Sequence, residues 1–248
     1  MFISFFFFTS NNNNNLILEY EYFYNSTKED YREDSYHDGY FEINQTANYK
    51  ICVYGAKAIK GGRGGEICGI NNFNKSDILY YKLGGTEAGG KGGKDCGFND
   101  KNDGYNGAGY GKINYSDNFL IVAGGGGGDS EERLNKGGDA GKNGGGELGG
   151  KAGTQSSGGK RGGSNGENGS QYKGGNADSS IMPKTFCGGG GGAGYYGGGS
   201  GGYGSKNKNG GGGGGSNFCK ANVCLYNETK INEIDYSGVR IYRYKNNK

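Results

Sequence analysis

The sequence predicts an all-β protein whose strands are interrupted by a long glycine-rich insert. Short segments alternate apolar and polar residues, or form brief apolar runs, and turn-prone residues separate them. No segment carries the 3.6-residue apolar stripe of an amphipathic helix. Glycine supplies 59 of the 248 residues, and 40 of these 59 lie between residues 124 and 215. We therefore expect strands on both sides of the insert and little helix.

The predicted strands fall into two groups, four before the insert and one after it. The residues Asn44-Gln45-Thr46-Ala47-Asn48 favour a turn between the first two strands. The continuous apolar run Phe119–Ala123 is typical of a buried strand, whereas the last strand alternates with period two. The five predicted strands cover residues 41–43, 49–54, 77–83, 119–123 and 238–244.

Composition changes divide the chain into a start, a leader and one large domain. The apolar run 2–8 is long enough for a signal-peptide core, but it lacks a positive flank and a small-residue cleavage site. A low-complexity start is therefore the alternative. No later stretch approaches the roughly 20 apolar residues of a membrane span, so we expect no transmembrane span. We divide the chain into a signal segment (1–10), an Asn-rich and acidic leader (11–38) and a glycine-rich domain (39–248), with a strand frame (39–123 and 217–248) and a glycine insert (124–216).

The insert has two interpretations. Ordering a chain costs about 1–2 kcal/mol per residue, and the insert has few apolar residues to offset that cost, which favours a flexible loop. Glycine-rich chain also adopts the polyproline II conformation, whose helices can pack side by side and hydrogen-bond to one another where glycine lets backbones approach. Such a bundle needs a frame, which the flanking strands and the edge cysteines Cys187 and Cys219 can supply. Both interpretations stay open on these grounds.

Cysteine and sequon content favours an oxidising compartment. No two cysteines have CxxC spacing and the chain has one histidine, so we expect no metal site. An even number of cysteines beside a poor apolar core fits disulfides, with free thiols in a cytosolic protein as the alternative. The disulfide candidates, whose pairing stays open, are Cys52, Cys68, Cys96, Cys187, Cys219 and Cys224. Sequons begin at Asn25, Asn44, Asn74, Asn114, Asn168 and Asn227, and all but Asn168 are taken as glycosylation candidates.

Several glycine-containing strings follow one another in a set order. They are Val53-Tyr54-Gly55-Ala56, residues 79–85, Gly104-Tyr105-Asn106-Gly107, residues 119–128, residues 153–159, residues 188–200 and Gly215-Ser216-Asn217-Phe218. This succession, over about residues 40 to 244, resembles the glycine-rich domain of the anaplastic lymphoma kinase and leukocyte tyrosine kinase receptor ectodomains. The resemblance implies a jelly-roll sandwich like that of tumour necrosis factor, carrying an inserted bundle of glycine-rich polyproline II helices. The family's tryptophan is absent, as is its GGATDIR string before Phe119.

The chain contains no recognisable catalytic set. A kinase requires H-R-D and D-F-G strings, and neither occurs. Residues 107–112 resemble a phosphate loop but end without its hydroxyl residue. We therefore expect no enzyme activity and no cofactor. A net charge of +3 does not indicate a nucleic-acid partner, and the Gly-Arg fragments 61–65 and 160–163 leave an RGG-like RNA binder as the weakest alternative.

We predict a non-catalytic extracellular or cell-surface module that gives a rigid scaffold for protein or glycan recognition. The missing catalytic set, the candidate secretory start and the resemblance to a receptor ectodomain support this prediction. The alternative is a structural matrix or cell-wall protein. Tyrosine offers a large contact area with few rotors, so Tyr195, Tyr196 and Tyr203 are the contact candidates. Packing between bundle and sandwich is the other interpretation of these three.

Overall fold

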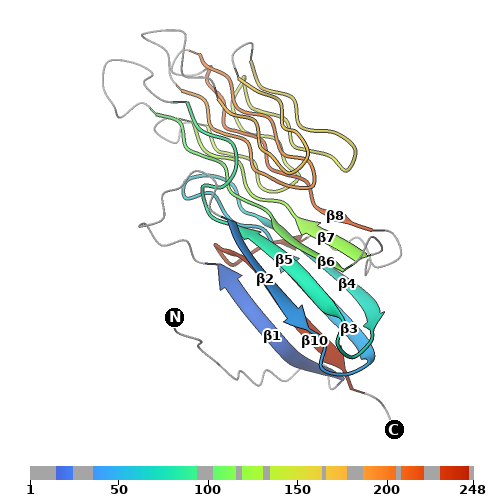
Figure 1. Ribbon diagram of the computed structural model, residues 1–248. Helices are drawn as coiled ribbons and strands as arrows, with labels where there is room; N and C mark the ends of the chain where they lie inside the picture. The colour runs from blue at the N-terminus through green and yellow to red at the C-terminus, as the bar shows by residue number, and fades with distance from the viewer. Residues whose placement is uncertain are drawn as a thin grey trace.

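The computed structural model describes nine stretches of the chain. These are residues 15–24, 36–93, 103–115, 119–130, 135–163, 166–177, 187–204, 208–220 and 230–245. Within them the fold is all β, and none of their residues forms a helix long and apolar enough to cross a membrane. Figure 1 shows the strands gathered at one end of the molecule and the glycine-rich segments at the other.

The strands of the described part form two antiparallel sheets of five strands each. The first sheet has the order β1-β10-β3-β4-β9 and the second has the order β2-β5-β6-β7-β8. The strands are β1 (Leu16–Tyr24), β2 (Tyr36–Glu42), β3 (Ala47–Tyr54), β4 (Gly65–Phe73), β5 (Ile78–Gly84), β6 (Gly111–Tyr115), β7 (Phe119–Ala123), β8 (Phe218–Cys219), β9 (Lys230–Ile231) and β10 (Ser237–Tyr244). The expectation of an all-β fold is thus confirmed.

The core lies between the two sheets, and strand alternation decides which residues enter it. In β5, Leu79, Tyr81 and Leu83 are buried, whereas Tyr80 and Lys82 between them point away from the core. Sixteen buried residues from both sheets make one cluster, so the sheets pack face to face. Aromatic side chains give this core much of its volume: Phe73 packs edge-on against Tyr49, Tyr115 and Phe119.

Two strands lie where the sequence indicated a leader. The expected domain boundary at residue 39 falls inside β2, and all of β1 precedes it. The acidic residues of β1 favoured a leader, but they have cationic partners on β10. Glu19 Oε1 lies 2.6 Å from Arg243 Nε, and Glu21 pairs with Arg240. The structured chain therefore begins earlier than composition indicated, because charges on a strand are stable when the neighbouring strand supplies the opposite charge.

The described part of the glycine insert is ordered by hydrogen bonds between segments far apart in the sequence. Along residues 210–216, successive backbone N–H groups donate to three neighbouring segments in turn. Each time the same segment accepts again, the accepting residue lies three positions earlier in the sequence. Gly210, Gly213 and Ser216 donate to Gly202, Gly199 and Tyr196; Gly211 and Gly214 donate to Gly145 and Lys142; Gly212 and Gly215 donate to Gly128 and Gly125. The segment is therefore surrounded by antiparallel neighbours and has a period of three residues.

Such close packing requires glycine at the contacts. A Cβ atom on Gly198 would collide with the carbonyl of Gly213, and one on Gly212 would collide with the carbonyl of Gly190. Residues 197–202 show the same period of three. The N–H groups of residues 197 and 200 donate to residues 170 and 167, those of 198 and 201 donate to 192 and 189, and those of 199 and 202 donate to 151 and 148. Backbone groups buried here thus pair with one another, and each such bond contributes a net stabilisation of about 0.5–1.5 kcal/mol.

The chain itself and a hydrogen bond join the bundle to the sandwich, and disulfides add covalent links within the fold. β7 runs directly into Gly124, whose N–H donates to Asn217 Oδ1 at 2.7 Å, immediately before β8. A disulfide joins Cys52 on β3 to Cys68 on β4, which are opposite each other with Cα atoms 4.1 Å apart. Cys187 and Cys219 also belong to disulfides. The other two disulfide candidates, Cys96 and Cys224, lie outside the described residues.

Replacing Gly198 with alanine will destabilise the protein, whereas the same change at Gly145 will not. The new methyl group of Gly198→Ala meets a carbonyl that the surrounding chains hold in place, so we expect a loss of about 1–3 kcal/mol. At Gly145, which is exposed, the closest atom to a new Cβ is the Lys136 carbonyl oxygen at 3.3 Å. Urea denaturation of both variants measures the difference, and equal midpoints would contradict the packed bundle.

Candidate functional site

Among the described residues, the histidine and the one cluster of candidate metal ligands have structural contacts. The single histidine, His37, stacks between tyrosine rings, with centroid distances of 4.9 Å to Tyr22 and 5.6 Å to Tyr24. Among the described residues, the one cluster with metal-ligand atoms is Cys52, Glu66 and Cys68. Its two sulfurs are bonded to each other, and a metal requires thiolates. The described residues therefore direct attention to surfaces rather than to a catalytic centre.

The face of the second sheet that points away from the core carries two adjacent rows of polar and aromatic side chains. Strand register places Asp38, Lys82 and Lys112 opposite one another on β2, β5 and β6; we call these the lysine row. Two residues along each strand, register places Tyr40, Tyr80 and Asn114 opposite one another; we call these the tyrosine row. Residues two apart on a strand share a face, so both rows lie on the same surface, the outer face.

The tyrosine row is unusually open to solvent. Tyr40 is 64% exposed and Tyr80 is 54% exposed, and they are the two exposed aromatic residues within the described part of the chain. Asn114 beside them is half-buried. Two neighbouring tyrosines therefore present their rings and hydroxyl groups to solvent from a rigid sheet.

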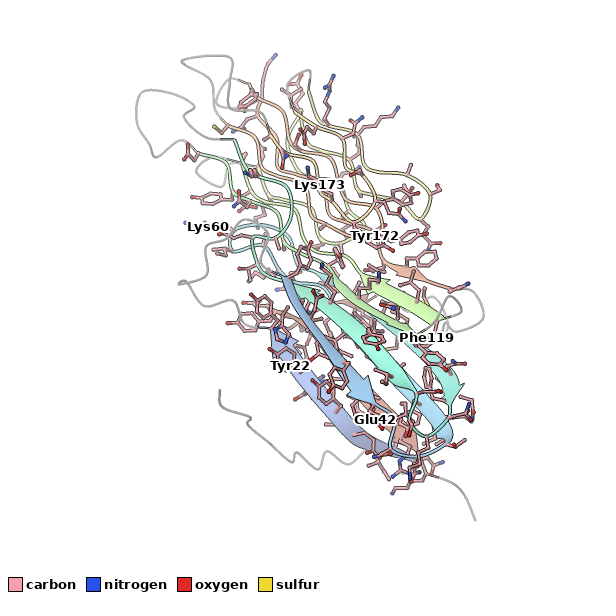
Figure 2. The ribbon with its side chains drawn as sticks, viewed as in Figure 1. Tyr22, Glu42, Lys60, Phe119, Tyr172 and Lys173 are labelled. Carbon is pink, nitrogen blue, oxygen red and sulfur yellow. A yellow bond between two sulfur atoms is a disulfide. The ribbon has the colours of Figure 1, made fainter. Side chains whose placement is uncertain are left out.

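A chain of aromatic contacts borders the lysine row where the sheet meets the glycine bundle. Its ring centroids follow at 5.0, 5.5, 5.9 and 3.8 Å along the series Tyr36, Tyr110, Tyr172, Tyr195 and Phe218. Figure 2 shows Tyr172 at the level where the bundle joins the sheets. Lys82 Nζ lies 4.9 Å from the centre of the Tyr36 ring, and Lys112 Nζ lies 5.0 Å from that of Tyr172. Each lysine thus has an aromatic ring beneath its ammonium group.

Charge on the lysine row is only partly balanced. Lys82 Nζ lies 4.0 Å from Asp38 Oδ2, and both of these side chains are exposed. Burial lowers the pKa of Lys112, and the neighbouring Lys82 ammonium lowers it further. Like charges directly opposite each other on neighbouring strands are unfavourable, and the rings beneath them offset part of that cost. The row therefore holds two cations and one carboxylate.

Of the three tyrosines expected to contact a ligand, Tyr195 and Tyr196 lie where the sheet meets the bundle, and Tyr203 lies toward the other end of the bundle. Tyr195 stacks on Phe218, Tyr196 packs edge-on against Tyr195, and both are half-buried. Tyr203, also half-buried, lies beside Gly93 and Cys187. The contacts of Tyr195 are those of the packing interpretation. The more accessible tyrosines are those of the tyrosine row.

The described glycosylation candidates occupy different surroundings. The Asn44 amide donates to Glu19 Oε2 at 3.0 Å, and Asn74 lies exposed beside the turn before β5. Asn114 belongs to the tyrosine row, so a glycan attached there would cover the outer face. In the sequon not taken as a candidate, Asn168 accepts a hydrogen bond from the Arg161 N–H. Asn25 and Asn227 lie outside the described residues.

Sequence reasoning did not find the outer face, although it predicted the strand that carries its centre. Tyr80 and Lys82 alternate with buried residues inside the predicted segment 77–83, and this signal marks them as outward-facing. Their neighbours Asp38 and Tyr40 come from β2, whose register with β5 depends on a pairing that sequence does not reveal. The rows therefore become visible only when the strands are paired.

Alkaline pH will destabilise the protein as its buried and half-buried tyrosines ionise. Burial raises the pKa of Tyr110 from 10.0 to about 12, and the pKa values of Tyr20 and Tyr172 are also raised, again chiefly by burial. A raised pKa means that the folded state favours the neutral phenol, so this stability is intact below pH 10 and is lost as the pH rises toward 12. Denaturation midpoints between pH 9 and 12 test this.

Substitutions test whether the Tyr110 hydroxyl causes the alkaline loss of stability. We expect Tyr110→Phe, which removes the ionising group, to reduce the alkaline loss of stability. Tyr40→Phe, on the exposed tyrosine row, is the matched control and should leave the pH dependence unchanged. The absorbance of tyrosinate, followed in the native protein, should show Tyr110 ionising late. A pH profile that is the same with and without the Tyr110 hydroxyl would contradict the assignment.

Comparison with known proteins adds no further identification. Neither the protein-family models nor the curated proteins contain a match to this chain. The resemblance to the glycine-rich domain of the receptor ectodomains therefore stays a prediction from the sequence.

Proposed function

We propose that this chain is a non-catalytic recognition module, extracellular or at a cell surface, that binds a protein or glycan through the outer face. The observation that carries the proposal is the exposure of Tyr40 and Tyr80, opposite each other on β2 and β5. Exposed tyrosines with an apolar body and a polar tip are characteristic of contact surfaces. The other aromatic side chains of the described residues are half-buried or buried, so exposed aromatic rings in the described part of the chain are concentrated on the outer face.

A rigid scaffold supports recognition because little conformational entropy is lost at contact. The tyrosine row sits on strands whose other face belongs to the main core. The bundle adds a second rigid body, for which we propose the polyproline II conformation; its hydrogen-bond period of three residues supports this. A jelly-roll connection of the strands, as in the glycine-rich receptor domains, is part of the same proposal.

The disulfide between Cys52 and Cys68 supports the extracellular location, since disulfides persist in oxidising compartments. A structural matrix protein remains the second candidate, favoured by the dense hydrogen bonding of the glycine bundle. An RNA-binding RGG arm has less support. Arg63 is exposed, but Gly62 and Gly64 on either side of it are buried, and the Arg63 N–H donates to Asp139 at 2.9 Å. That fragment is part of the fold.

The full chain, tagged at its carboxyl end and expressed in eukaryotic cells, should be found outside the cytosol with its cysteines oxidised. Cell fractionation followed by thiol labelling measures both properties. Recovery in the medium or on the cell surface fits a recognition module, and recovery in insoluble wall material fits the matrix candidate. A cytosolic or nuclear protein with reduced thiols would contradict the extracellular proposal.

Removing the exposed rings should abolish ligand capture without unfolding the protein. We expect the double variant Tyr40→Ser/Tyr80→Ser to lose binding to the glycans or surface proteins that the wild type captures from a defined panel, by about tenfold or more. The double variant Leu18→Ser/Ile59→Ser is the matched control, because it removes two exposed apolar side chains elsewhere. Thermal unfolding of both variants verifies the fold. Unchanged capture by the tyrosine variant would refute the role of the outer face.

A further inference from the structure

We propose that the outer face binds an acidic glycan, with the lysine row holding a sugar carboxylate and the tyrosine row contacting the sugar rings. This inference rests on the proposed function and names the ligand class for the same surface. The observation behind it is the placement of an unbalanced pair of cations directly beside an exposed pair of tyrosines.

Charge complementarity calls for an anion at the lysine row. Lys82 and Lys112 are opposite each other on β5 and β6, and the one carboxylate of the row, Asp38, is exposed; it lies 4.0 Å from Lys82 Nζ, and its charge also acts on Lys112. An anionic group placed between the two ammonium groups would relieve their mutual repulsion. The tyrosine rings below the lysines hold both ammonium groups near the surface of the sheet, so the cations are in place before the ligand arrives.

The tyrosine row offers contacts for the sugar ring that carries the anionic group. Sugars present C–H groups on their ring faces and hydroxyl groups around their edges. The electron-rich faces of Tyr40 and Tyr80 attract C–H groups, and the tyrosine hydroxyls and the Asn114 amide can hydrogen-bond to sugar hydroxyls. A carboxylated sugar would therefore engage both rows at once, whereas an inorganic anion would engage only one.

The size of the two rows favours a glycan over a protein. Residues on one face repeat about every 7 Å along a strand, and strands lie about 5 Å apart, so the two rows over three strands cover on the order of 100–200 Å². A standard protein interface buries about 800 Å² on each partner. The area of the two rows instead corresponds to that of a few sugar rings.

The test is calorimetric titration of the disulfide-intact full chain with oligogalacturonate and with the same oligosaccharide as its neutral methyl ester. The protein is produced in the oxidising periplasm of a bacterial host that adds no N-glycans, so Asn114 is unmodified. We expect binding of the acid, binding of the ester weaker by about tenfold or more, and a decline with added salt.

Two double variants assign the charge effect to the lysine row. Lys82→Gln/Lys112→Gln should lower the affinity for the acid by about tenfold or more. Lys75→Gln/Lys142→Gln is the matched control: it removes the same charge from two exposed lysines, and Lys142 has an aspartate partner, Asp139, at 3.3 Å as Lys82 has Asp38. The control variant should bind the acid as the wild type does.

The remaining outcomes separate the two levels of the proposal. Equal binding of acid and ester, lost in Tyr40→Ser/Tyr80→Ser, would overturn the acidic ligand and leave the recognition module standing. Equal losses in both lysine variants would overturn the lysine row as the site. Capture of polyglutamate through Lys82 and Lys112, with sialylated, sulfated and uronate oligosaccharides all unbound, would overturn the glycan in favour of an acidic protein. Failure of every probe of the panel would overturn the outer face as a binding surface.

Discussion

The structure depends on backbone groups that pair with one another where glycine allows the chains to touch. In residues 210–216, successive backbone N–H groups donate to three neighbouring segments in turn, so the same neighbour accepts again every third residue. A side chain at Gly198 or Gly212 would separate these chains and break the pairing on both sides. Hydrogen bonding in place of apolar burial explains how a stretch with few large apolar residues is ordered, because a hydrogen bond between buried backbone groups offsets the cost of removing them from water.

The sandwich and the bundle contribute different kinds of stability, and they meet where the chain passes from one to the other. The sandwich has a conventional core in which Phe73 and Phe119 are fully buried and pack against each other. Entry to the bundle at Gly124 and exit at Asn217 are joined by one hydrogen bond, so the ends of the insert are held together beside β7 and β8. Because loop closure is costly in entropy, a frame that fixes both ends lowers the cost of ordering what lies between them.

Sequence patterns predicted the parts of the fold that depend on local alternation and missed those that depend on partners. The segments around β3, β5, β7 and β10 alternate or are continuously apolar, and each of them was predicted. β1 was not, because Glu19 and Glu21 are acceptable on a strand only beside Arg243 and Arg240, more than two hundred residues away. Sequence alone likewise does not separate Tyr195 from Tyr40, because the difference between them lies in their partners. Composition does not reveal that Phe218 stacks on Tyr195 and that Tyr40 faces solvent.

The outer face departs at the lysine row from what stability alone would select. Lys82 opposite Lys112 puts like charges across neighbouring strands, directly beside the exposed rings of Tyr40 and Tyr80. Where every other level of a fold is consistent, such local departures concentrate at functional positions. The tyrosine rings under the two ammonium groups show that the fold stabilises the lysine pair instead of avoiding it. A surface that holds cations together beside exposed aromatic rings is therefore better explained by a ligand that needs both than by the requirements of the sheet.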